Sequence, residues 1–307
     1  MEFCIFVEPQ EGLTWEQLAT IARETERLGF DGFFRSDHYI APDRALRGAP
    51  AISDAWTTLA GLAVATERVR LGTLVTPVTF RHPGALAVQV ANVDAMSGGR
   101  VELGFGAGWN APEHAAYGIP FPGKRFGLLT EALEVMTGLW ATAPGETFSF
   151  EGEHLRLDRA LGVQRPVQDA IPLIIGGGGA TRTPALTARF ATEYNTGWEP
   201  DAVIAERFAR VVAACEAADR DPETLGLSVA LTATIGATPA DADARARAIG
   251  LDPARQRTHG LHGTPAQVAD RIADLAGLGA GRVYLQLLDP TDLEQLELLV
   301  EATQAAG

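Results

Sequence analysis

Eight strand-like runs that alternate with helical segments are the feature that most constrains this fold. The runs are apolar and rich in β-branched or aromatic residues: Glu2–Val7, Gly32–Arg35, Val69–Val75, Arg100–Phe105, Ile171–Ile175, Tyr194–Thr196, Gly226–Ile235 and Val283–Leu287. Helical periodicity follows most of them, as from Thr14 to a stop signal at Gly29. Strand–helix alternation with short connections is typical of a parallel sheet. We therefore predict an α/β fold, a (β/α)8 TIM barrel, with a doubly wound open sheet as the alternative.

Two segments interrupt the alternation, one after the fourth strand and one after the fourth helix. The first is a long loop at 106–124, and the second is an insertion at about 142–170 in which Thr147–Phe150 and His154–Leu157 can pair as a hairpin. Further loops are expected at Ile40–Ile52 and around His259 and His262. Because the alternation resumes after the insertion, we expect residues 1–307 to form a single domain.

Charge and composition argue against several function classes. The chain has 25 basic and 39 acidic residues, a net charge of −14, which disfavours nucleic-acid binding. Lys124 is the only lysine, which argues against aldolase-type Schiff-base chemistry. With no membrane-length apolar run and no signal-like N-terminus, we expect a cytoplasmic protein without a membrane partner. Cys4 and Cys215 are expected to be core residues rather than a disulfide.

Polar residues and glycines gather at the carboxyl ends of the predicted strands, where barrel enzymes carry their active sites. His38 is the best acid–base candidate, because the ordinary pKa of histidine is near 6.5. Asp37 can accept a hydrogen bond from a cofactor or pair with an arginine. An ordinary strand end is the alternative for both residues. The complete set of strand ends is Glu8, Asp37–His38, Thr73–Thr76, Gly106–Asn110, Gly176–Thr181, Gly197–Trp198 and Gln286.

Two glycine-rich segments indicate a site for a flat molecule that carries a phosphate. Gly176–Thr181 joins a strand to a helix, so its backbone N–H groups and the helix dipole can hold an anion; a tight structural turn is the alternative. It matches neither a Rossmann fingerprint nor a Walker loop. The glycines of 104–110 let a flat group approach the backbone, with Trp109 as a wall or as loop packing. Glu113 and His114 follow, facing either the mouth or solvent.

The histidines do not suggest a metal site. No His-x-His follows the first strand, and His259 and His262 at i, i+3 on a glycine-containing segment are more typical of a loop. No nucleophile elbow and no Cys–His arrangement is present. We therefore expect no metal and no covalent nucleophilic catalysis.

Taken in order, these motifs resemble the luciferase-like monooxygenase superfamily, and in particular its coenzyme F420-dependent oxidoreductase branch. The resemblance covers nearly the whole chain and implies a barrel that binds a deazaflavin or flavin in a cleft at the strand ends. The motifs that carry it are Arg35–His38, Leu71–Pro77, Met96–Arg100, Gly104–Asn110 with Glu113, Gly176–Gly179, Gly263–Pro265 and Gly281–Val283.

The resemblance also implies roles for individual residues. His38 would be the catalytic proton partner, and Glu8, Trp109 and Glu113 would line the substrate pocket. The cofactor ring would lie against a bulge with a cis peptide bond between Leu74 and Val75. The implied cofactor-binding residues are Asp37, Thr73, Leu74, Val75, Thr76, Ala107, Gly108, Gly176, Gly177, Gly178, Gly179, Ala180 and Thr181.

The implied activity is hydride transfer between coenzyme F420 and a small organic substrate, in a homodimer. Sugar-phosphate dehydrogenases of this branch use lysines to hold their substrate's phosphate and a carboxylate on the fourth-strand loop. Here Trp109 stands at about that carboxylate's place and the only lysine is elsewhere, so we expect an uncharged or aromatic substrate. Two alternatives stay open: an FMN-dependent monooxygenase served by a separate reductase, and a non-catalytic flavin-binding barrel.

Overall fold

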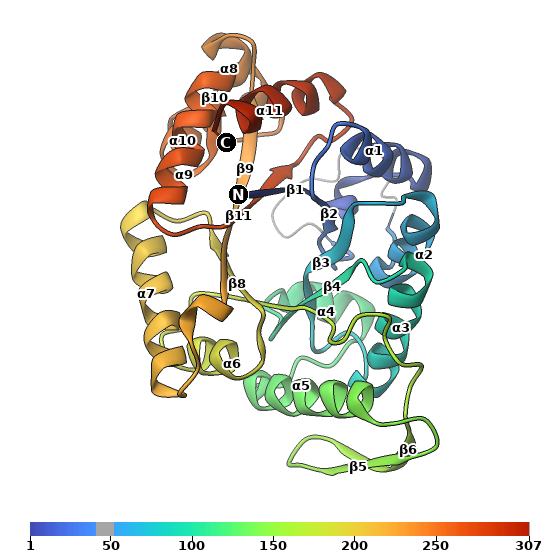
Figure 1. The fold of residues 1–307 in the computed structure, drawn as a ribbon. Helices are drawn as coiled ribbons and strands as arrows, with labels where there is room; N and C mark the ends of the chain where they lie inside the picture. The colour runs from blue at the N-terminus through green and yellow to red at the C-terminus, as the bar shows by residue number, and fades with distance from the viewer. Residues whose placement is uncertain (41–51, 307) are drawn as a thin grey trace.

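A closed barrel of eight parallel strands forms the centre of the computed structural model, which describes residues 1–40 and 52–306 (Figure 1). Each barrel strand pairs in parallel with its two neighbours, and β9 closes the ring between β8 and β11. This confirms the predicted (β/α)8 barrel and rules out an open sheet. The barrel strands are β1 (Glu2–Val7), β2 (Gly32–Arg35), β3 (Arg70–Pro77), β4 (Val101–Gly106), β7 (Leu173–Gly176), β8 (Glu193–Gly197), β9 (Gly226–Ile235) and β11 (Arg282–Leu287).

Helices surround the barrel and bury their apolar faces against it (Figure 1). In the first helix the Thr14 side chain accepts from the Gln17 N–H and the Gln17 side chain accepts from the Thr14 N–H, a capping box. Leu18, Ile21 and Ala22 lie on its buried face, as the periodicity predicts. The outer helices are α1 (Trp15–Arg27), α2 (Ala55–Ala65), α3 (Pro83–Ser97), α5 (Arg125–Ala141), α6 (Arg182–Phe190), α7 (Asp201–Ala217), α10 (Pro265–Gly277) and α11 (Leu293–Ala306).

Two segments predicted as loops contain regular structure. The segment 106–124 holds α4 (Ala111–Tyr117), and the histidine-bearing segment after α8 (Pro239–Ala248) holds α9 (Pro253–His259) and β10 (Leu261–Gly263). The loop predictions were wrong here because two-turn helices are too short to show helical periodicity. β10 pairs in parallel with β9. The short 3-10 helices are η1 (Pro9–Glu11) and η2 (Pro222–Thr224).

A two-stranded antiparallel hairpin lies between α5 and β7, next to α5 (Figure 1). Its strands are β5 (Thr147–Glu151) and β6 (Arg156–Leu161), so the second begins two residues later than predicted. His154 and Leu155 belong to the turn, because their N–H groups donate to the Glu131 carboxylate on α5 at 2.9 and 2.8 Å. Most of the loop predicted at Ile40–Ile52 lies outside the described residues.

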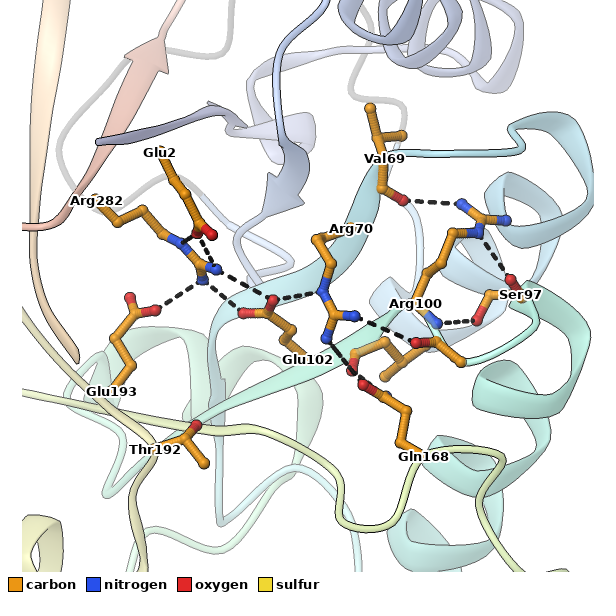
Figure 2. Close-up of polar contacts among 12 residues, drawn as sticks. Glu2, Val69, Arg70, Ser97, Arg100, Glu102, Gln168, Thr192, Glu193 and Arg282 are labelled. Carbon is orange, nitrogen blue, oxygen red and sulfur yellow. Dashed lines mark hydrogen bonds and ion pairs between the residues drawn. The ribbon is translucent and has the colours of Figure 1, made fainter. Parts of the chain in front are cut away.

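Charged side chains form a network at the amino-terminal ends of the strands, which we call the barrel floor (Figure 2). Arg282 Nη1 donates to Glu102 Oε2 at 2.6 Å and to Glu193 Oε2 at 2.7 Å. Arg70 Nε donates to Glu102 Oε1 at 2.6 Å, and Glu2 pairs with Arg282. Glu102 and Glu193 are almost completely buried, so these partners are needed to offset the loss of hydration.

The two cysteines lie where the sequence predicts, and the described helices are short or polar. Cys4 and Cys215 are both buried and free, as predicted for core residues. Within residues 1–40 and 52–306, none of the helices is long and apolar enough to cross a membrane.

Candidate active site

A cavity of about 530 Å³, which we call the slot, opens at the carboxyl ends of the barrel strands. Its walls come from β1, β3, β4, β7, β8 and β11, with side chains from α5 and α6. Glu8, His38, Leu74, Val75, Ala107, Gly108, Trp109 and Gly176–Gly179 are the sequence-predicted site residues that line it. Eight parallel strands thus bring segments from far apart in the chain to one end of the barrel.

A bulge in β3 forms one wall of the slot. The Leu74–Val75 peptide bond is cis, as the resemblance implied, and the β3–β4 register shifts between Thr73 and Thr76. Leu74 and Val75 line the slot, whereas Thr73 and Thr76 are buried behind it and share a 3.1 Å hydrogen bond. A Cβ on Gly104 of β4 would lie 2.0 Å from the Thr73 carbonyl oxygen. Gly104 therefore makes room for the bulge backbone rather than for a bound ring.

Asp37 supports this wall from behind. Its side chain is 1% exposed and accepts from Thr76 Oγ1 at 2.8 Å and from Arg81 Nη1 at 2.5 Å. The structure thus shows the arginine pair that the sequence allowed. Asp37, Thr73 and Thr76, predicted to bind a cofactor, have side chains that bond to one another and to Arg81 and do not line the slot.

His38 is held by Glu113, a residue in the first turn of α4. His38 Nδ1 lies 2.8 Å from Glu113 Oε2, and Glu113 Oε1 accepts from the N–H groups of Tyr39 and Ile40. Glu113, predicted to line the substrate pocket, is fully buried and does not line the slot, so it reaches the slot only through His38. With Nδ1 engaged, Nε2 is the ring nitrogen left for a ligand. His114, one residue on, is buried and bonded to Asn110 and Thr79.

The charges around His38 set its protonation. Burial by itself would lower the pKa of His38, but the hydrogen bond and the charge of Glu113, with Glu8 and Asp37 nearby, raise it above its ordinary value. Burial would raise the pKa of Glu113, but the bonds from His38 and the two backbone N–H groups lower it. Glu113 therefore stays ionised at neutral pH, and His38 is poised to exchange a proton.

The four-glycine turn ends the slot at the start of α6. Gly176–Gly179 and Thr183 line the slot, whereas Ala180 and Thr181 do not. Thr181 makes no side-chain capping bond, so the first N–H groups of α6 have no cap from it. Arg207 of α7 reaches this turn, because a Cβ on Gly178 would lie 2.6 Å from its guanidinium. The sequence reading missed Arg207, since no local spacing links α7 to the turn.

The chemistry of the slot matches a flat ring with a phosphate-bearing tail. Leu74, Val75 and Ile175 supply an apolar surface, and the glycine turn supplies backbone donors. The Arg207 guanidinium lies beside the turn, where it also donates to Thr196 and pairs with Glu199. The helix N-terminus favours an anion at the same end. The residues present therefore suit a flavin or a deazaflavin. The described residues contain no group of three or more His, Cys, Asp or Glu that could hold a metal ion.

Glu8, Gln286, Thr232 and Trp198 form a hydrogen-bonded chain at the carboxyl ends of the strands, next to the slot. Glu8 accepts from Gln286 Nε2 at 2.7 Å and from Gln10 Nε2 at 2.5 Å. Gln286 Oε1 in turn accepts from Thr232 Oγ1 at 2.6 Å and from Trp198 Nε1 at 3.2 Å. Trp198 has a left-handed backbone conformation with φ of 56°, which is costly for a residue other than glycine and is held by its surroundings.

Comparison with known proteins identifies relatives of this chain. An uncharacterized protein of Mycobacterium tuberculosis is 32% identical over 193 residues, which cover 59% of this chain and 66% of that protein. An F420-dependent glucose-6-phosphate dehydrogenase of Nakamurella multipartita is 37% identical over 183 residues. That match covers 59% of this chain and 51% of the relative, so the chain aligns with about half of it.

A solved structure shows the same fold over the whole chain. An F420-dependent secondary alcohol dehydrogenase, in complex with an F420–acetone adduct, has a TM-score of 0.86 at 18% identity and covers 100% of this chain and 99% of its own. The family model described as luciferase-like monooxygenase matches residues 1–260. Since that match covers most of the 307 residues, the chain belongs to the luciferase-like monooxygenase family.

Proposed function

We propose that this protein is a coenzyme F420-dependent oxidoreductase that transfers a hydride between the deazaflavin and a small organic substrate. The observation that carries the proposal is His38, which lines the slot beside the Leu74–Val75 bulge and is held through Nδ1 by the buried Glu113. Hydride transfer to a carbonyl carbon, or from a carbinol carbon, needs a group that gives or takes the proton on the neighbouring oxygen, and this pair supplies one. The F420-dependent names among the relatives support the choice of cofactor.

Each wall of the slot has a task in this reaction. The deazaflavin supplies the hydride acceptor or donor when it is bound. Leu74 and Val75 support its ring, and Arg207 with the glycine turn holds the phosphate. In alcohol oxidation His38 accepts the hydroxyl proton at Nε2, and in ketone reduction it returns that proton. Glu113 orients the imidazole and stabilises its charged form. Asp37, Thr73 and Thr76 keep the bulge in place.

Titration of the purified protein with each cofactor tests the choice between F420 and FMN. The expected result is tight binding of F420, measured through the change in its fluorescence. Binding of FMN without F420 would instead support the FMN-dependent monooxygenase. Binding of F420 with no hydride transfer to a broad panel of alcohols and ketones would support a non-catalytic barrel.

His38→Ala tests the role of the histidine. We expect turnover to fall by roughly 10²–10⁴-fold, the range for a lost general acid–base, while the affinity for F420 stays close to that of the unchanged protein. Stopped-flow measurement of cofactor reduction gives the rate, and the fluorescence titration gives the affinity. Unchanged turnover would make His38 a structural residue.

The homodimer implied by the resemblance is part of this proposal. Light scattering of the purified protein measures its mass directly, and twice the 32.5 kDa of one chain is the expected value. A mass of one chain at working concentration would contradict it.

A further inference from the structure

A second cavity of about 740 Å³ adjoins the slot, and we call it the chamber. The two cavities share five lining residues: Glu8, His38, Trp109, Trp198 and Gln286. The remaining walls of the chamber come largely from Thr232 of β9, the segment 250–252 and α9. A molecule in the chamber would therefore lie beside His38 and next to a cofactor held in the slot, as a substrate must.

Glu8 places an unbalanced negative charge where the two cavities meet. Its hydrogen-bond donors are the side-chain amides of Gln10 and Gln286, and among the described residues it forms no ion pair. These amides donate hydrogen bonds to the carboxylate but do not neutralise its charge. An anionic group beside the reacting carbon would therefore face a like charge in a partly desolvated site, whereas a hydroxyl group could donate to the carboxylate.

The other charged groups near this junction do not offset the charge of Glu8, and two of those that line the chamber, Glu11 and Asp252, are acidic as well. His38 is paired with Glu113, so the pair is neutral when the imidazole is protonated and does not offset Glu8. Arg255 of α9 lines the chamber but is exposed, so water and salt weaken its attraction for an anion. The charges behind the bulge are two arginines and two aspartates, Arg35, Arg81, Asp37 and Asp54.

The rest of the chamber favours a flat apolar body. Trp109 and Trp198 present their indoles at the junction with 63% and 41% of their surface exposed. Trp198 is fixed by its hydrogen bonds to Thr232 and Gln286, so it offers a rigid apolar wall.

We propose that the chamber takes an alcohol or ketone with a flat apolar body and no charge beside the reacting carbon, and that Glu8 excludes 2-hydroxy and 2-oxo acids. This inference rests on the proposed function. In the oxidation direction the carbinol C–H bond breaks and its electron pair passes as hydride to the deazaflavin. The hydroxyl proton passes to His38, and the carbon–oxygen double bond forms.

Two pairs of nearly isosteric probes test whether Glu8 excludes 2-hydroxy and 2-oxo acids. Mandelamide and mandelate differ only in an amide or a carboxylate beside the carbinol carbon, and 2-oxo-2-phenylacetamide and phenylglyoxylate are the matching ketones. We expect kcat/KM for the amide to exceed that for the acid by at least about 10-fold. In Glu8→Gln the ratio should narrow to within about 3-fold. Glu16→Gln, the same change on the exposed face of α1, is the control and should keep the original ratio.

Ligand-observed NMR with the two ketones measures binding without turnover, in the presence and absence of F420. The same preference for the amide, narrowed by Glu8→Gln and not by Glu16→Gln, is expected. Equal binding of amide and acid, or a ratio that Glu8→Gln leaves unchanged, overturns the inference. A preserved binding preference with no hydride transfer would refute the proposed function while the assignment of the chamber stands.

Discussion

At the scale of single residues, the site depends on side chains that never touch a ligand. In the proposed reaction Glu113 acts only through His38, which it contacts by one carboxylate oxygen while the other is held by two backbone N–H groups. A carboxylate that is fixed in this way cannot follow the imidazole if it turns. The geometry therefore makes Glu113 a positioning residue with a defined electrostatic effect on its neighbour.

Glu113→Gln should separate the effect of Glu113 on the position of His38 from the effect of its charge. Removing the carboxylate lowers the pKa of His38, so the neutral imidazole that accepts the proton in alcohol oxidation forms at lower pH. We expect the midpoint of the kcat–pH profile to move down by about one pH unit, with a lower plateau rate. Thr79→Val, which alters the contact with the neighbouring His114, is the control and should leave the midpoint in place. An unmoved midpoint in Glu113→Gln would show that another group titrates.

The sequence located the residues at strand ends but not their orientations. His38, Trp109 and the glycine turn follow directly from apolar runs, so position along the chain was sufficient to predict them. The orientation of Asp37 depends on Arg81, 44 residues away, and the turn is completed by Arg207 from a separate helix. Such contacts depend on packing between elements, which no local spacing reports.

At the scale of elements, β3 and β4 fit together only because β4 has glycine beside the bulge. The Cβ that any other residue would bring at Gly104 has no space, since the nearest atom is a backbone carbonyl oxygen rather than a flexible side chain. The alternating glycines of β4 are thus part of the wall on which the ring is proposed to rest.

Gly104→Ala should weaken both the fold and the cofactor site. The backbone shift needed to admit the methyl group should lower the free energy of unfolding by roughly 1–3 kcal/mol, the usual range for overpacking. The affinity for F420 should fall as well, because the bulge moves. Urea unfolding and the fluorescence titration measure the two effects. Gly277→Ala, where nothing lies within 4 Å of the added Cβ, is the control. If both variants kept the parent's stability and affinity, the bulge would be more tolerant than proposed.

Element boundaries were predicted best where turn signals flank a strand. β1, β2 and β9 match their predicted ranges, because glycine, proline or polar residues bound each apolar run. α4 and α9 were missed because seven residues give barely two turns, and neither shows a continuous apolar face. α9 is the more consequential omission, since it lines the chamber.

At the scale of the whole molecule, the two ends of the barrel have different electrostatic tasks. The strand carboxyl ends present the slot and the chamber, whereas the barrel floor holds the network around Arg282. Burial raises the pKa of Glu193 to about 7, helped by the charge of Glu102 and opposed by Arg282. Glu193 in the barrel floor can therefore titrate near neutral pH, independently of His38.

The stability of the protein should depend on pH through Glu193. Its pKa is higher in the folded chain than in the unfolded chain, so its contribution is fully present below the ordinary pKa of about 4.5 and is lost as pH rises to about 7. The free energy of unfolding should fall across this window with a slope of at most about 1.4 kcal/mol per pH unit from this group. Glu193→Gln should flatten the slope, as urea unfolding at several pH values would show. An equal slope in both proteins would assign it to other groups.

The single lysine, Lys124, has a practical consequence for anyone who handles this molecule. Lys124 carries the only ε-amino group among 307 residues and is well exposed, one residue before the helix whose Phe126 lines the slot. Amine-directed chemistry on side chains is therefore confined to one position, at the start of α5. A dye, a spin label or a surface tether attached there would leave the barrel floor unmodified.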